Sequence, residues 1–131
     1  MLTNIVSRLD TATADATAPR VTAATLSRRR FRAASRGRSA AAAVAAGTKV
    51  RYTLSEPATS GFRVQRRKGR RYVMLQGRFK HVGDMGTNHF KFTGRLRGRK
   101  LRPGRYRLVM VAVDAAANKS PRKRLRFQIV R

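Results

Sequence analysis

The chain has 131 residues, no cysteine, and 32 Lys and Arg residues against five Asp and Glu residues, which gives a formal net charge of +27. This length suits one domain, and the lack of cysteine excludes disulfide cross-links and thiolate metal sites. No run approaches the roughly 20 apolar residues of a membrane-spanning helix, while the scarcity of acids favours polyanions as partners.

Residues 1–18 predict a flexible N-terminal linker, followed by one folded domain over 19–131. Apolar residues between Leu2 and Leu9 have helical spacing, but a helix this short is marginal in isolation. The Thr- and Ala-rich stretch 11–19 has nothing to bury. The start of the chain lacks the basic leader and apolar core of a signal peptide, so we expect either a cytoplasmic protein or a piece of something larger.

Short alternating apolar runs predict β-strands from residue 20 onward. Residues 20–27 form the first expected strand, and Phe31 is expected to continue it after the kink of three arginines. The Ala-rich stretch 39–46 predicts either a turn or two of helix or a small-residue connection. Residues 47–54 alternate clearly and predict the next strand.

The middle of the chain predicts two strands around Phe62 and Tyr72, joined by a hairpin over 66–70. We expect residues 77–88, which contain three glycines, to form a long loop, and 89–93 to form another strand.

The last third of the chain predicts the most regular strands. Residues 106–113 are apolar on both faces, which is typical of a central strand or of one flanked by a neighbouring domain. Residues 114–121 are the last expected loop, and 125–129 alternate as the closing strand. Six to eight short strands at this spacing predict an all-β, antiparallel sandwich.

A Pro-Gly turn enters the strand at 106, in the order Leu101-Arg102-Pro103-Gly104-Arg105-Tyr106. This stretch resembles the tyrosine corner of immunoglobulin-like and fibronectin type III-like sandwiches, which have about seven strands. The resemblance implies that the Tyr106 hydroxyl bonds a backbone group a few residues upstream and fixes the crossover between sheets.

More specifically, the chain resembles Ig-like modules of secreted and surface proteins of high-GC Gram-positive bacteria over residues 20–131. That resemblance implies an extracellular or cell-surface location, with the cytoplasm as the alternative. There is no Trp and no Cys pair, so the disulfide-bonded antibody type is excluded, and Ala117 stands where such modules usually carry Gly. The matching stretches are 31–34, 47–56, 86–88, 92–95, 101–106, 114–120 and 127–130.

Catalytic and metal sites have little support in the sequence. His81 and His89 are the only imidazoles, and Asp84 is the one acid near them in sequence, so we expect no enzyme, no cofactor and no small-molecule substrate. Asp114 and Asn118 offer oxygen ligands to a hard cation, but the strongly positive surroundings favour a loop-capping role, and we expect no metal.

The basic residues form runs that exceed what solubility requires, so we expect them to contact a polyanion. The runs are spread over several loops, which predicts diffuse electrostatic attraction and no shaped pocket. No motif for reading bases is present. The expected contacts are Arg28, Arg29, Arg30, Arg66, Arg67, Lys68, Arg70, Arg71, Arg95, Arg97, Arg99 and Lys100.

Together these observations predict a non-catalytic accessory module, acting as a spacer or adhesion domain against anionic cell-envelope polymers. Neighbouring domains of a larger chain are further expected partners. The alternative hypothesis is a small basic nucleic-acid-binding protein.

Overall fold

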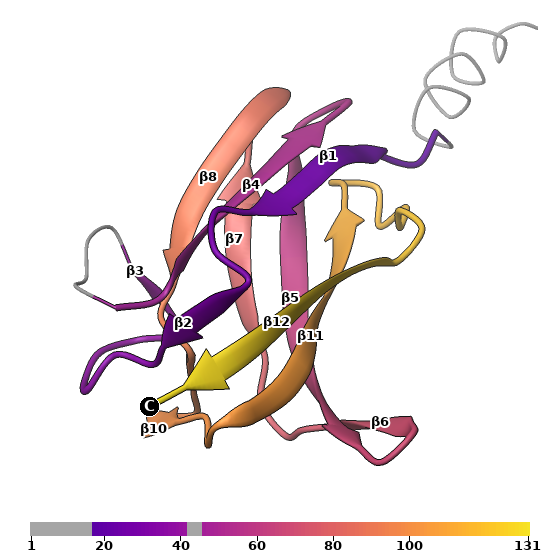
Figure 1. Ribbon diagram of the computed structural model, residues 1–131. Helices are drawn as coiled ribbons and strands as arrows, with labels where there is room; N and C mark the ends of the chain where they lie inside the picture. Colours follow the sequence, from indigo (N-terminus) through magenta and orange to yellow (C-terminus); the bar gives the residue numbers. More distant parts are fainter. Residues whose placement is uncertain (1–16, 42–45) are drawn as a thin grey trace, which may run out of the picture.

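The computed structural model describes residues 17–41 and 46–131, and all regular structure in this part of the chain is β-strand (Figure 1). The predicted linker, 1–18, lies outside the described residues except for its last two positions. No described segment is a helix with the length and apolar character that crossing a membrane requires. The strands are β1 (Val21–Leu26), β2 (Arg30–Arg32), β3 (Ala40–Ala41), β4 (Thr48–Leu54), β5 (Ala58–Lys68), β6 (Arg71–Met74), β7 (Phe79–Gly83), β8 (Gly86–Phe92), β9 (Arg95–Leu96), β10 (Arg99–Lys100), β11 (Gly104–Val113) and β12 (Lys123–Val130).

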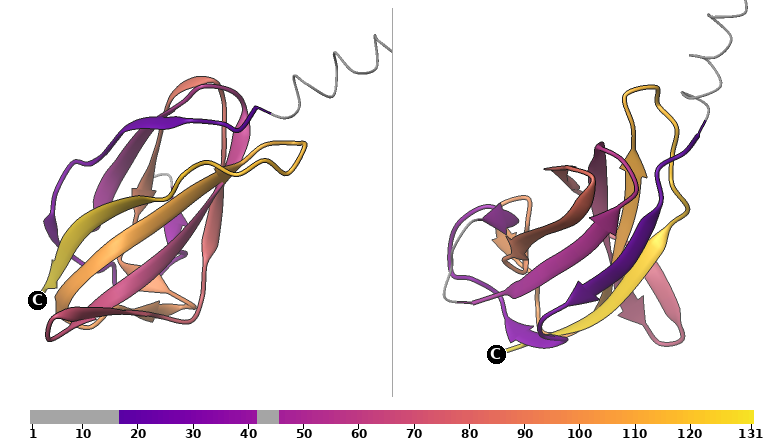
Figure 2. Two further views of the ribbon diagram at one scale, coloured as in Figure 1. Left: turned by 90° about the vertical axis from the view of Figure 1, so that its right-hand side faces the viewer. Right: turned by 90° about the horizontal axis from the view of Figure 1, so that it is seen from above.

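Two larger sheets face each other across one core (Figure 2). One sheet has the order β1-β4-β8-β3. The other has the order β2-β12-β11-β5-β6, with β7 paired to the first half of β5, and β9 and β10 form a separate hairpin. Every strand pair is antiparallel except β2 with β12. The all-β, mainly antiparallel prediction is confirmed, and the arrangement is consistent with a sandwich.

The twelve strand segments among the described residues exceed the number expected from the sequence because several have only two or three residues. The central strand was expected correctly. β11 lies between β12 and β5, and its inward side chains Tyr106, Leu108 and Met110 are no more than 1% exposed. Since successive strand residues point to opposite faces, this register also fixes which residues face outward.

Aromatic rings join the two sheets through the core. Phe31 from β2 meets Phe92 from β8 edge to face, with ring centroids 6.1 Å apart, and stacks on Phe127 from β12 at 5.4 Å. Phe62 from β5 contacts Phe90 from β8 in the same edge-to-face manner at 5.1 Å. These geometries are favourable for ring quadrupoles and add to the apolar area buried.

The expectation that Phe31 continues the first strand is wrong. β1 pairs with β4 in the four-stranded sheet, whereas β2 pairs with β12 in the other, so the chain changes sheets at the arginine kink. Buried Thr48 holds this change of direction: its hydroxyl accepts from the Arg28 N–H at 2.9 Å and donates to the Arg28 carbonyl at 2.8 Å.

The expected long loop over 77–88 is also wrong, because it contains β7 and the start of β8. Phe79 points inward and stacks on Phe62, with ring centroids 5.1 Å apart, which ties β7 to the core. The turn between the two strands needs few residues, since Gly86 has a φ of +98° and the Asn88 side chain bonds the backbone of Asp84. The glycine content marked a tight turn instead of a loop.

Two residues of the Ala-rich stretch 39–46 form a short strand. Ala40 and Ala41 form β3 and pair with Phe92 and Lys91 of β8, so the helical alternative is wrong for these two residues. Residues 39 and 46 are bends, and residues 42–45 lie outside the described part of the chain.

Candidate polyanion interface

The outer face of the six-stranded sheet carries arginines from four adjacent strands. These arginines point outward because successive residues of a strand point to opposite faces, and their neighbours in sequence point into the core. Phe31, Phe127 and Val64 are examples of such buried neighbours. No Asp or Glu occupies an outward position on these described strands. We name this set the cationic face; it consists of Arg30 and Arg32 (β2), Arg124 and Arg126 (β12), Arg105 and Arg107 (β11), and Arg63 and Arg67 (β5).

Strand pairing places some of these like charges directly opposite each other. Arg107 is the cross-strand partner of Arg126, and Arg105 and Arg30 flank Gln128 on either side. The Cβ atoms at such positions lie about 5 Å apart, and like charges on directly opposite residues are destabilising. The fold therefore keeps an unneutralised positive surface that an external anion would relieve.

Three members of the cationic face are oriented by neighbouring groups. Arg67 donates from Nε to the Gly69 carbonyl at 2.9 Å. The Arg107 guanidinium lies 4.0 Å from the centroid of the Tyr72 ring, and its Nε donates to Gln65. Arg63 donates from Nη2 to the Leu75 carbonyl at 3.1 Å. These contacts restrict the side chains, so less rotamer entropy is lost when an anion binds.

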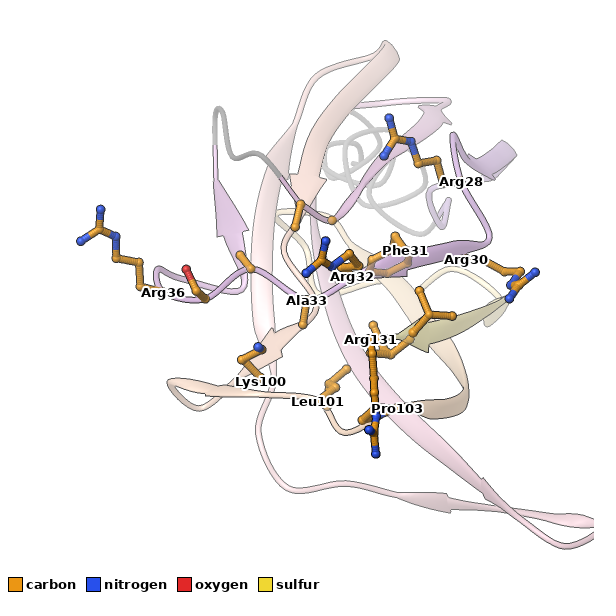
Figure 3. A pocket seen from close by; sticks show the side chains of 16 residues that line it. Arg28, Arg30, Phe31, Arg32, Ala33, Arg36, Lys100, Leu101, Pro103 and Arg131 are labelled. Carbon is orange, nitrogen blue, oxygen red and sulfur yellow. The ribbon is translucent and has the colours of Figure 1, made fainter.

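A concavity of about 1050 Å³ lies beside β2, next to the end of β12 (Figure 3). Buried Phe31 and Ile129 contribute to its floor, and Leu101 and Pro103 to one wall. None of the described residues that line it is acidic. Six basic residues of the described chain line it: Arg28, Arg30, Arg32, Arg36, Lys100 and Arg131.

The wall formed by the segment 34–39 is held in place by Arg95 and Thr93. Arg95 donates to the carbonyls of Ala34 at 3.1 Å, Gly37 at 3.0 Å and Gly98. The buried Thr93 hydroxyl lies 2.6 Å from the Arg38 carbonyl. Because the guanidinium of Arg95 bonds three backbone groups, this predicted polyanion contact has a structural role in the fold.

The structure brings together only part of the predicted polyanion set. Arg28, Arg30 and Lys100 meet at the concavity, whereas Arg29 lines a smaller hollow of about 350 Å³ with Arg124 and Arg126. Three of the twelve predicted contacts therefore line the concavity, and the others are spread over separate parts of the surface. The other predicted contacts lie at hairpins: Arg67, Lys68, Arg70 and Arg71 are exposed around the β5–β6 turn, and Arg97 and Arg99 are exposed on the β9–β10 hairpin, where Arg97 bonds Gln76.

Arg66 differs from the other arginines of β5 because it lies on the same side of the strand as the buried Phe62 and Val64. Its Nη1 donates to the hydroxyl of Tyr106 at 2.9 Å, and that hydroxyl donates to the Arg102 carbonyl at 2.6 Å. Burial raises the pKa of Tyr106 despite the opposing charge of Arg66. The upstream backbone bond expected from the Pro-Gly-x-Tyr stretch is present, and Arg66 adds a second bond that the sequence did not suggest.

Asp114 and Asn118 cap the last loop as expected. Asp114 Oδ1 accepts from the backbone N–H groups of Ala116 at 3.0 Å and Asn118 at 2.9 Å, and Oδ2 accepts from the Asn118 amide at 3.1 Å. Ala117 has a φ of +68°, so alanine occupies a left-handed position that favours glycine. Local backbone strain therefore occurs at the one position of this loop where the sequence suggested glycine in place of alanine.

His81 takes part in the packing between β7 and the opposite sheet. Its Nδ1 is hydrogen-bonded to the Tyr52 hydroxyl at 2.6 Å, and its ring stacks on Phe90 with centroids 4.7 Å apart. Burial, and to a smaller extent the charge of His89, lowers the pKa of His81 below its ordinary value of 6.5.

We therefore expect His81 to titrate below pH 6.5. The folded protein then binds fewer protons than the unfolded chain, so the stability is complete above pH 6.5 and decreases as the pH falls below that value. An NMR titration of both imidazoles measures the midpoint, and His89→Gln assigns the signals. In that variant the His81 midpoint should rise, since a neighbouring charge is lost. A midpoint at or above 6.5 in the wild-type protein would contradict the prediction.

The expected polyanion contacts did not include six residues of the cationic face: Arg32, Arg63, Arg105, Arg107, Arg124 and Arg126. The signal that could have found them is a period of two. Arginine recurs at alternate positions in 105–107 and 124–126, and the positions between them are apolar. Contiguous basic runs lie mainly at turns, so a search for such runs overlooks arginines that alternate with apolar residues along a strand.

No protein-family model matches this chain, and a search of curated proteins gave no match either.

Proposed function

We propose that this domain is a non-catalytic module that binds linear anionic polymers of the cell envelope through its cationic face, as a spacer or adhesion domain. The formal net charge of +27 supports long-range attraction of polyanions. The observation that carries the proposal is the direct cross-strand pairing of Arg107 with Arg126 on a face without outward acids in the described strands.

We also infer that the fold belongs to the Ig-like or fibronectin type III-like kind of sandwich and works outside the cell. The support is the Tyr106 hydroxyl bond to the Arg102 carbonyl at the entry to β11, the position that a tyrosine corner occupies. Modules of this shape suit a spacer because their loops lie at the two ends of the sheets.

Nucleic acid is the second candidate ligand because arginine guanidinium groups bind phosphate in the same bidentate way wherever it occurs. A duplex would contact the cationic face through its phosphates, without reading base sequence. Its binding would then depend strongly on salt and weakly on sequence.

The test compares poly(glycerol phosphate), heparin and duplex DNA in a salt series. We expect Arg105→Gln/Arg126→Gln to weaken binding of all three at physiological salt and, for duplex DNA, to reduce the salt slope by about 1.8, the share of two phosphate contacts. The matched control is Lys49→Gln/Lys91→Gln, which removes two lysine charges at directly opposite positions of the other sheet. The control should change binding little.

Equal losses in the two double variants would contradict an interface on the six-stranded sheet. Tighter binding of duplex DNA than of the other polymers would favour the nucleic-acid candidate over the envelope polymer. Similar retention of all three polymers would argue against a dedicated nucleic-acid role.

A further inference from the structure

We propose that the concavity beside β2 is the anchoring site of the polymer, and that it takes a thin, linear phosphate chain that carries no nucleobases. This inference rests on the proposed function, since it names the substrate class and the place of tightest contact. Arg30 and Arg32 belong both to the cationic face and to the rim of the concavity, so the two surfaces form one continuous path.

The arrangement of the rim indicates several anionic groups in series. Arg28, Arg36 and Arg131 lie at well-separated points around the concavity and do not converge on one position (Figure 3). A single phosphate could contact only a part of this set. A chain of phosphates that crosses the concavity could approach each of these arginines in turn, and each contact releases condensed counterions.

The volume of the concavity favours a thin occupant over a duplex. A volume of about 1050 Å³ is close to that of sites that enclose one small molecule. A nucleic-acid duplex, whose major groove alone is about 12 Å wide, is too thick to enter and would remain on the outer sheet face.

A single strand is disfavoured for a different reason. Binding of single strands relies on bases stacking on exposed aromatic rings. Phe31 is the one aromatic residue among the described lining residues, and it is only 3% exposed, with its ring already packed against Phe92 and Phe127. A polyol phosphate needs no stacking partner, so it suits a basic rim over a floor of packed side chains.

The concavity is formed before the polymer arrives. Arg95 and Thr93 bond the backbone of the segment 34–39, which carries Arg36, and the Gly47 N–H donates to the Arg32 carbonyl at 2.9 Å. A rim fixed in this way loses little backbone entropy on binding. This preorganisation is the reason for expecting more affinity here than at an exposed hairpin with the same charge.

The experiment compares two triple variants that each remove three charges. The first, Arg28→Gln/Arg36→Gln/Lys100→Gln, changes the rim of the concavity; the second, Lys68→Gln/Arg70→Gln/Arg71→Gln, changes the exposed β5–β6 hairpin. Binding of poly(glycerol phosphate), a single-stranded oligonucleotide and duplex DNA is measured by calorimetry at one salt concentration, and thermal unfolding checks that each variant is folded.

We expect the rim variant to weaken binding of poly(glycerol phosphate) at least tenfold more than the hairpin variant does, and the two variants to weaken binding of duplex DNA equally. Equal effects on poly(glycerol phosphate) would overturn the anchoring site while the proposed function stands. A larger rim effect on the oligonucleotide than on poly(glycerol phosphate) would overturn the assignment of a base-free chain. If the wild-type protein binds none of the three polymers, the proposed function itself fails.

Discussion

Replacing Gly47 with alanine should destabilise the domain by about 3 kcal/mol or more, whereas the same change at Gly37 should cost about 1 kcal/mol. Both glycines have a positive φ, +103° at Gly47 and +109° at Gly37, so both variants carry the same backbone strain. A Cβ on Gly47 would also fall on the carbonyl oxygen of Phe92 and lie 3.1 Å from the Cα of Thr93, whereas a Cβ on Gly37 meets nothing within 4 Å.

The difference between the two variants therefore measures the close approach of the chain to the end of β8. Urea unfolding of both proteins gives the two free energies, and the wild-type m-value provides the check for two-state behaviour. Similar losses at the two positions would show that backbone strain alone matters and that Gly47 is not tightly packed. A large loss at Gly37 would contradict its open surroundings.

Gly47 also links the fold to the candidate site. It lines the concavity, and its N–H donates to the carbonyl of Arg32, one of the rim arginines. Displacement of this backbone would move β2, which pairs with β12 through only three residues. A folded Gly47→Ala protein would then be expected to bind poly(glycerol phosphate) less tightly than Gly37→Ala.

Much of the fold could be predicted because alternation is a local signal. The strands at 47–54 and 125–129 alternate regularly, and the strand at 106–113 is apolar on both faces. Each one is present close to its predicted bounds. The segment 77–88 was misread because its three glycines mark tight positions in a hairpin, which composition alone does not separate from a loop. The change of sheet after β1 depends on the buried Thr48 hydroxyl, a contact between residues distant in sequence.

The candidate site was less predictable because its residues come together only through strand order. Arg126, Arg107 and Gln65 are consecutive positions across three strands, although they are far apart in the chain. The rim of the concavity likewise combines Arg28 with Lys100. Arg66 was misassigned to the surface because the hairpin was expected to begin there; β5 continues to Lys68, which leaves Arg66 on the inner side of its strand.

Replacing Tyr106 with phenylalanine should lower the free energy of unfolding by about 1–3 kcal/mol, since one hydroxyl makes two hydrogen bonds and one of these comes from a charged group. The change removes the acceptor of Arg66 and the donor to the Arg102 carbonyl, while the ring keeps its stack on Phe127. Tyr72→Phe is the matched control, because Tyr72 contributes its ring to Arg107 and should cost little.

A double-mutant cycle with Arg66→Met separates the two hydrogen bonds. If the hydroxyl joins Arg66 to the backbone of the crossover, Arg66→Met should destabilise the wild-type protein more than it destabilises Tyr106→Phe, and the difference is the coupling between the two side chains. Additive effects would show that Arg66 acts only through its charge or its packing over the ring. An unchanged unfolding curve for Tyr106→Phe would contradict the view that this hydroxyl fixes the entry to β11.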